Sequence, residues 1–160
     1  MKLPHAKSNG FTIIELLVVV IVLCILASLV AFTYSGVQAQ NRNAERKADV
    51  DMLKGQLEAF YASSNKYPNY ANLSDTTWRQ ANLPRLENDA TRDPNWKDNN
   101  TVCTANEQPT LAAKPATNCY SYQVTGTDGS PCDNDKIPCA HYTLTSMLEG
   151  GEKYTKSSLN

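Results

Sequence analysis

The feature that most constrains this chain is an apolar run from Phe11 to Phe32, which has 22 residues and a single carboxylate, Glu15. About 20 apolar residues suffice for a helix to cross a bilayer, so the run predicts a transmembrane helix. A carboxylate within such a segment costs on the order of 2.5 to 3.5 kcal/mol on insertion scales, so it is expected to have a function and a partner. Glu15 is therefore the first candidate functional residue.

The start of this run carries a recognisable pattern: a short basic leader, the junction Gly10-Phe11, and Glu15 four residues after Phe11. The pattern closely resembles the class III signal of type IV pilins and type II secretion pseudopilins. The resemblance implies that a prepilin peptidase cuts after Gly10, removes the leader over residues 1–10, and leaves Phe11 as the N-methylated N-terminus. It also implies that Glu15 neutralises the N-terminal ammonium of a neighbouring subunit in a filament. Such pairing offsets part of the cost of burying two charges and fixes the axial register between subunits.

Two other interpretations of the N-terminal region stay open. The first is an ordinary secretory signal peptide, with Lys2 and Lys7 as its basic start and Val37-Gln38-Ala39 as a cleavage site. The apolar cores of such signals have about 7 to 15 residues. This run is longer, and Glu15 would have no use in a discarded segment. The second is a plain single-pass anchor, which explains the length of the run but neither Gly10 nor Glu15.

Apolar periodicity continues beyond the membrane run, so the helix is expected to extend past it. No proline interrupts residues 11–67. The stop signal is Ser63-Ser64-Asn65 followed by Tyr67-Pro68, because the residue before a proline is pushed towards extended geometry. We therefore predict one helix over about residues 11–63, whose second half, within 33–66, is amphipathic. The apolar stripe expected to dock a globular domain is Val50, Leu53, Leu57 and Phe60.

At 160 residues, with 41% hydrophobic and 19% charged residues, the chain has a globular composition and room for one modest ectodomain. Removal of residues 1–10 would leave 13 basic and 16 acidic side chains, a charge of −3. Basic and acidic residues are interleaved in the middle of the helix, so we interpret them as a solvated face and predict no nucleic-acid partner. The basic ones are Arg42, Arg46 and Lys47, and the acidic ones are Glu45, Asp49 and Asp51.

The globular ectodomain is expected over residues 67–160. It begins with a packed loop over 69–100, rich in Asn, Asp, Thr and Pro, with one short helical turn near 75–80. Apolar residues alternate in two later segments, 118–125 and 140–148, which predicts two half-buried strands in an antiparallel hairpin. Together with the resemblance, these elements give the fold class α+β. The resemblance implies the pilin fold, a long N-terminal helix packed on a small antiparallel sheet with disulfides.

Four of the five cysteines lie in the ectodomain, where an even number indicates disulfides in a secreted protein. Four cysteines allow three pairings. We favour the sequence-local one, Cys103 with Cys119 and Cys132 with Cys139, because short loops closed in order are easiest to form. A loop of about 15 residues closed in this way contributes roughly 3 kcal/mol in the chain-entropy model. Cys24, within the apolar run, is expected to behave as a small apolar residue.

Acidic residues in the connection between the two strands are weak candidates for calcium ligands. They are Asp128, Asp133 and Asp135, with Asn134 beside them. Their oxygens suit calcium, and the major pseudopilins that the chain resembles bind calcium in their C-terminal region. An EF-hand would need glycine at its sixth position, which is Pro138 when counted from Asp133. The sequence thus favours a solvated turn over a calcium site, and it implies no other cofactor.

No nucleophile and base constellation can be assembled from the one ectodomain histidine and scattered serines, so we expect no enzyme activity. The resemblance implies a structural subunit of a type IV pilus-like filament. Its partners would be further copies and other pilins, the prepilin peptidase, an inner-membrane platform protein and an assembly ATPase. The alternatives are a type II secretion pseudopilin, or a minor tip pilin that binds surfaces or DNA.

The resemblance also implies a location. The prepilin would be a single-pass protein of the cytoplasmic membrane with an external C-terminal domain. After assembly the subunit would belong to a filament at the cell surface.

Overall fold

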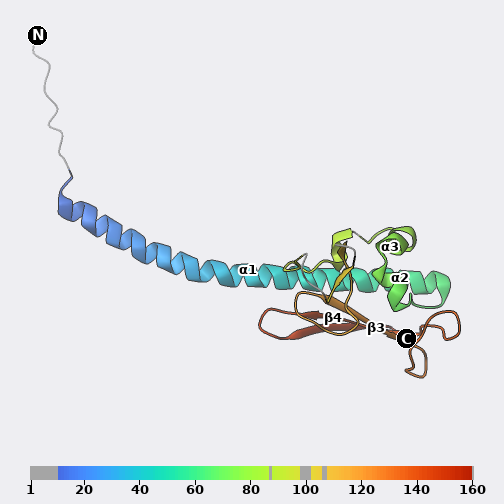
Figure 1. Ribbon diagram of the computed structural model, residues 1–160. Coiled ribbons are helices and arrows are strands. Elements are labelled where there is room, and N and C mark those ends of the chain that lie inside the picture. The colour runs from blue at the N-terminus through green and yellow to red at the C-terminus, as the bar shows by residue number, and fades with distance from the viewer. Residues whose placement is uncertain (1–10, 87, 98–101, 106–107, 160) are drawn as a thin grey trace, which may run out of the picture. The chain divides into compact units, whose positions relative to one another are not determined.

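A computed structural model describes most of the chain (Figure 1). The described residues are 11–86, 88–97, 102–105 and 108–159. The chain divides into two compact units, residues 1–39 and 40–160, and helix α1 (Ile13–Ser64) runs from the first into the second. The predicted helix over about 11–63 therefore agrees with α1 to within two residues at either end.

The part of α1 in the first unit exposes its apolar side chains. Leu16 and Leu29, for example, are 63% and 62% exposed, and the most hydrophobic 18-residue window of the helix is 0% buried. By length and composition, α1 qualifies as a helix that can cross a membrane. Such a surface needs lipid or other apolar helices around it, because exposed apolar patches of this extent mark interaction sites.

The core of the second unit forms between the later part of α1 and the elements that follow it (Figure 1). Val50, Leu53 and Leu57 are fully buried, and Phe60 is partly buried against the same cluster. This is the predicted docking stripe. Each fully buried Val or Leu contributes roughly 1.5 to 3 kcal/mol of burial free energy. The stripe packs in a cluster with Tyr67, Leu73, Leu83, Leu111, Tyr120, Tyr122, Tyr142 and Leu144.

The two predicted strands are present as β3 (Tyr120–Thr125) and β4 (His141–Met147), and they pair antiparallel. Tyr122 lies opposite Leu144 in the register, and both side chains are buried. Period-two alternation placed these residues on the core face. The predicted fold class, an α+β pilin fold with a small antiparallel sheet, is confirmed.

Three strands were not predicted. β5 (Lys153–Ser157) pairs with β4 and completes the order β3-β4-β5, after a turn in which Gly150 and Gly151 have φ of 104° and 88°. Its side chains are exposed or half-buried, so its sequence lacks the apolar alternation of a strand that buries one face in the core. β1 (Thr104–Ala105) and β2 (Gln108–Pro109) form a separate pair of two residues each, too short to leave a pattern in the sequence.

The predicted loop over 69–100 is more helical than expected. α3 (Thr76–Asn82) covers the predicted turn near 75–80, and its N-cap, Asp75, accepts hydrogen bonds from two backbone N–H groups. α2 (Tyr70–Ser74), which was missed, starts at Asn69, whose side chain caps Asn72. A 3-10 helix, η1 (Asn88–Thr91), follows. Asn and Asp are favoured at helix N-caps as much as in loops, which explains the difference.

Two disulfides brace the second unit. They join Cys103 to Cys119 and Cys132 to Cys139, with Cα atoms 5.9 and 5.2 Å apart. This is the sequence-local pairing. The second bond lies in the connection between β3 and β4, where Cys139 is fully buried and its carbonyl accepts a hydrogen bond from the Tyr67 N–H. The connection is therefore tied to the end of α1.

Candidate functional site: the first turn of α1 and a buried polar network

The first turn of α1 holds Glu15 in a capping box. Thr12 donates to Glu15 Oε2 through its backbone N–H, at 2.9 Å, and through its hydroxyl, at 2.7 Å. In return the Glu15 N–H donates to Thr12 Oγ1 at 3.3 Å. A Thr followed three residues later by Glu is the sequence signature of this motif. This local role of Glu15 was not predicted, although the signature Thr12-x-x-Glu15 precedes the apolar run in the sequence.

The capping box fixes where the carboxylate of Glu15 lies. Both hydrogen bonds from Thr12 end on Oε2, and the charge stays at the N-terminal end of the helix, where the helix dipole favours an anion. Phe11, the residue before Thr12, is 86% exposed. Gly10 lies outside the described residues, so the Gly10-Phe11 junction has no structural account.

A second polar group of the apolar run is satisfied locally. The Ser28 hydroxyl donates to the backbone carbonyl of Cys24 at 2.6 Å, one helical turn earlier. Cys24 is a free cysteine with an exposed side chain. Ser28 therefore adds no polar group that needs an outside partner, unlike the charge of Glu15.

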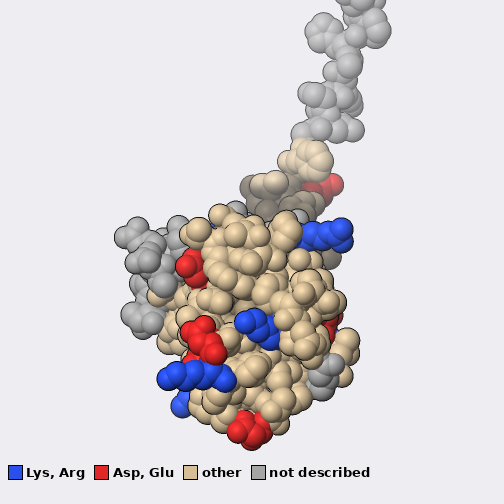
Figure 2. Space-filling view, turned by 90° about the vertical axis from the view of Figure 1, so that its right-hand side faces the viewer, with Lys and Arg blue, Asp and Glu red and all other residues tan. Residues whose placement is uncertain are grey.

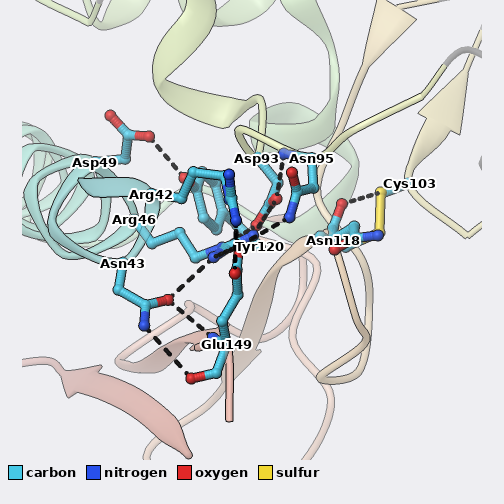
Figure 3. A network of polar contacts seen from close by, with 11 residues as sticks. Arg42, Asn43, Arg46, Asp49, Asp93, Asn95, Cys103, Asn118, Tyr120 and Glu149 are labelled. Atoms are coloured by element: carbon cyan, nitrogen blue, oxygen red, sulfur yellow. Dashed lines mark hydrogen bonds and ion pairs between the residues drawn. A yellow bond between two sulfur atoms is a disulfide. The ribbon is translucent and has the colours of Figure 1, made fainter. Parts of the chain in front are cut away.

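The second unit contains a buried ion pair, and the predicted solvent exposure of Arg46 is wrong. Arg46 was interpreted as part of a solvated face, but its side chain is 1% exposed and that of Asp93 is 0% exposed. The Arg46 guanidinium donates to both oxygens of Asp93, at 2.7 and 2.9 Å (Figure 3). Arg46 lies 47 positions before its partner, so no local pattern announces the pair.

Glu149 extends this network from the turn after β4. Arg42 donates to both of its oxygens, Arg46 donates to Oε1 at 3.3 Å, and Asn95 donates to Oε1 at 3.0 Å (Figure 3). Asn43 accepts a hydrogen bond from the Glu149 N–H at 2.8 Å. The Arg42 guanidinium, helped by Arg46 and Asn95, lowers the pKa of Glu149 to about 2. Glu149 is therefore ionised throughout the physiological range.

Acidic residues of α1 also accept hydrogen bonds from two tyrosines of the sheet and from Tyr67, which follows α1. Tyr120 donates to Asp49 at 2.6 Å, and Tyr142 and Tyr67 donate to the two oxygens of Glu58 at 2.7 and 2.9 Å. Burial and the hydrogen bond to Asp49 raise the pKa of Tyr120 well above its ordinary range. The polar face of α1 is thus a second docking face, held by charge-assisted bonds.

Two of the three calcium candidates, Asp128 and Asp133, accept hydrogen bonds within their own turns. Asp128 Oδ1 accepts from the Ser130 N–H and hydroxyl, at 2.9 and 2.6 Å. Asp133 Oδ1 accepts from three backbone N–H groups, the first of which belongs to Asp135. These bonds lower the pKa of both Asp128 and Asp133. Across the described residues, no three His, Cys, Asp or Glu side chains gather as a metal site.

Comparison with known proteins gives one family match and several relatives. The family described as Prokaryotic N-terminal methylation motif matches residues 5–31. The type IV major pilin protein PilA of Myxococcus xanthus is 30% identical over 68 residues, which are 42% of this chain and 31% of that protein. The type II secretion system core protein G of Aeromonas hydrophila is 32% identical over 62 residues, which are 39% of this chain and 43% of that protein.

A third relative, core protein G of Dickeya chrysanthemi, is 31% identical over 62 residues, 39% of this chain and 40% of that protein. The chain thus spans less than half the length of the curated relatives it matches. No solved structure matches it. The matched motif covers the N-terminal region, and these relatives are a pilin and two secretion core proteins. These matches support the predicted resemblance to type IV pilins and type II secretion pseudopilins.

The buried pair can be tested by Asp93→Asn, which keeps the shape of the side chain but removes its charge. We expect the free energy of unfolding to fall by about 3 to 5 kcal/mol, because Arg46 would stay buried without a full countercharge. Denaturation of the full chain in detergent micelles, followed by tryptophan fluorescence, measures this loss. In the control Asp51→Asn, the carboxylate is 50% exposed and pairs with Lys156 at 3.1 Å, so we expect about 1 kcal/mol or less. Equal losses would contradict the account.

The pH dependence of stability provides a second test through Glu149→Gln. The folded-state pKa of Glu149, about 2, lies below its ordinary value of 4.5. Its stabilising contribution is therefore present above pH about 4.5 and is lost as the pH falls towards 2. The melting temperature of the variant should lie below that of the wild type by a constant amount from pH 5 to 8, and the gap should close below pH about 4.5. Glu152→Gln, at an exposed position of the same turn, should show no such change; a pH-independent gap for Glu149→Gln would refute the assignment.

Proposed function

We propose that the chain is a prepilin that becomes a structural subunit of a type IV pilus-like filament and performs no catalysis. One observation carries the proposal. A methylation motif over residues 5–31 coincides with an exposed apolar helix that has a carboxylate, Glu15, in its first turn. A plain anchor would account for the apolar helix but for neither the motif nor Glu15, and an enzyme needs neither of these two.

Processing comes first in this proposal. The prepilin peptidase cuts the Gly10-Phe11 bond, residues 1–10 leave as the leader, and the amine of Phe11 is methylated. Phe11 is highly exposed and stands two residues ahead of the start of α1 at Ile13, which supports its accessibility. The cut creates a new ammonium group close in sequence to Glu15.

Before assembly, residues 11–32 hold the subunit in the cytoplasmic membrane, with residues 33–66 and the globular ectodomain over 67–160 outside. The exposed apolar surface of the first unit supports this stage, because lipid covers it at no cost. The assembly ATPase and the inner-membrane platform protein then move the subunit into the filament, where apolar helices of other pilins take the place of lipid.

Glu15 guides this last step. Hydrogen bonds from Thr12 stabilise its carboxylate but leave the charge unneutralised. The N-terminal ammonium of a neighbouring subunit supplies the missing charge in an apolar filament core. The energy gained by pairing depends on axial position, so the pair fixes the register between subunits. The mature side-chain charge of −3 adds no basic surface for a nucleic-acid partner.

A second candidate function is that of a type II secretion pseudopilin, which the similarity to the two core G proteins favours. A minor tip pilin is the remaining alternative. Copy number in purified surface filaments separates the three. A major pilin forms the dominant band, a tip subunit is present in traces, and a pseudopilin is absent.

The proposal is tested by comparing Glu15→Ala with Thr12→Val in cells that also make the wild-type chain. Glu15→Ala removes the charge, and we expect normal membrane insertion but at least tenfold less incorporation into filaments. Thr12→Val removes the hydroxyl contacts to Glu15 and keeps the carboxylate. It should cost only about 0.5 to 2 kcal/mol of helix capping and leave incorporation close to normal.

Quantification of each variant in membranes and in sheared filaments gives both numbers. Normal incorporation of Glu15→Ala would contradict the pairing of subunits through Glu15. Equal defects in the two variants would reduce Glu15 to a helix cap.

A further inference from the structure

The second unit has a cavity of about 350 Å³ at the end of α1, where α2, α3 and the disulfide-braced connection meet. This volume lies in the lower part of the range of small-molecule sites, roughly 300 to 1,000 Å³. None of its lining residues takes part in the assembly role proposed for the first unit. The residues that define its chemistry are Phe60, Lys66, Asn72, Trp78, Asp133 and Asp135.

One side of the cavity is aromatic. The rings of Phe60 and Trp78 lie 5.4 Å apart between centroids and meet at 63°, so they form an apolar corner. Both side chains are only half-buried, and both line the cavity. A pyranose ring presents a face of C–H groups that packs on such a surface, while its hydroxyl groups point to the sides.

The other sides are polar and held in place. The Asn134 amide donates to the Tyr67 carbonyl at 2.7 Å and accepts from the Cys139 N–H at 2.9 Å. The Asn69 amide donates to the Asp133 carbonyl at 2.8 Å. The disulfide Cys132–Cys139 closes the same loop. This framework is rigid without a ligand, as a pre-organised binding site requires.

Two side chains of the rim remain available to a ligand. Asn72 and Asp135 both line the cavity, and they take part in the hydrogen bonds of the framework through their backbone N–H groups rather than through the side-chain amide or carboxylate. An amide donates and accepts, and a carboxylate accepts two hydrogen bonds. Together they match neighbouring hydroxyl groups, each of which both donates and accepts.

The charge of the cavity restricts the ligand further. Among the lining residues, Lys66 is the one cation, and Asp133 and Asp135 are the two anions. The Lys66 ammonium already donates a hydrogen bond to the Asn134 carbonyl at 3.4 Å. On the face of the molecule shown in Figure 2, uncharged residues predominate and both basic and acidic side chains are present, so this face carries no strong charge of one sign. A phosphate or carboxylate ligand would meet net negative charge here, whereas a neutral hydroxylated ligand meets none of this repulsion.

We propose that this cavity binds a neutral saccharide, with the sugar ring on Trp78 and its hydroxyl groups on Asn72 and Asp135. The inference goes beyond filament assembly. It concerns the second unit alone, so it can fail while the proposed function stands, and the reverse also holds.

The test uses the unassembled full chain in a detergent without a sugar head group. Three neutral probes, lactose, maltotriose and diacetylchitobiose, and one anionic probe, sialyllactose, are titrated while tryptophan fluorescence is recorded. Trp78 lines the cavity, whereas Trp96 is 9% exposed and its indole N–H donates to the Cys103 carbonyl, so the signal reports on Trp78. We expect saturable binding of at least one neutral probe, at least tenfold tighter than that of sialyllactose.

Variants assign the binding to the cavity. Asn72→Ala and Asp135→Asn should each weaken the affinity about tenfold, which is the loss of about 1.4 kcal/mol. Matched controls are Gln56→Ala, in a neighbouring cavity, and Glu152→Gln, on the turn before β5, and both should bind like the wild type. Circular dichroism checks that all four variants fold.

Three results would overturn the proposal. They are no saturable binding of any neutral probe, equal affinities in the rim variants and the controls, or a fluorescence change produced by calcium alone and lost in Asp135→Asn. The last result would assign the acidic rim to a cation.

Discussion

Within the described residues, Glu15 is a charge without a neutralising partner, and this charge constrains what the first unit can do. Glu15 sits in the first turn of a helix whose apolar side chains are exposed, and Thr12 stabilises its carboxylate without neutralising it. In lipid the charge is expensive, so any assembly that brings a cation to it is favoured over the isolated subunit. In the proposed assembly, the exposed apolar surface packs against other helices and the charge of Glu15 sets the axial register between subunits.

In the second unit, a buried charge is neutralised by a partner within the same unit. Arg46 is a full charge buried at 1% exposure, and Asp93 neutralises it through two hydrogen bonds. Buried pairs of this kind add little net stability over apolar residues, because desolvation offsets the attraction. Their effect is on position. The pair and the Glu149 cluster hold the 93–95 segment and the turn after β4 in one place on α1.

Features with local causes could be predicted from the sequence. α1 follows from apolar periodicity and the stop before Pro68, and β3 and β4 follow from alternation, because one face of each is buried. The burial of Arg46 could not be predicted, because its partner is remote in sequence and interleaved charges usually indicate a solvated face. β5 carries no core pattern because its side chains are largely exposed. The capping box of Thr12 and Glu15 has a local sequence signature and was therefore predictable, although only the intermolecular role of Glu15 was predicted.

The central claim is that cleavage at Gly10-Phe11 creates the partner of Glu15. Intact mass spectrometry of the chain from cells that contain a prepilin peptidase tests it most directly. The account predicts a mature chain that begins at Phe11 and is heavier by one methylene group. A chain that begins at Gln40, or one that keeps residues 1–10, would contradict it.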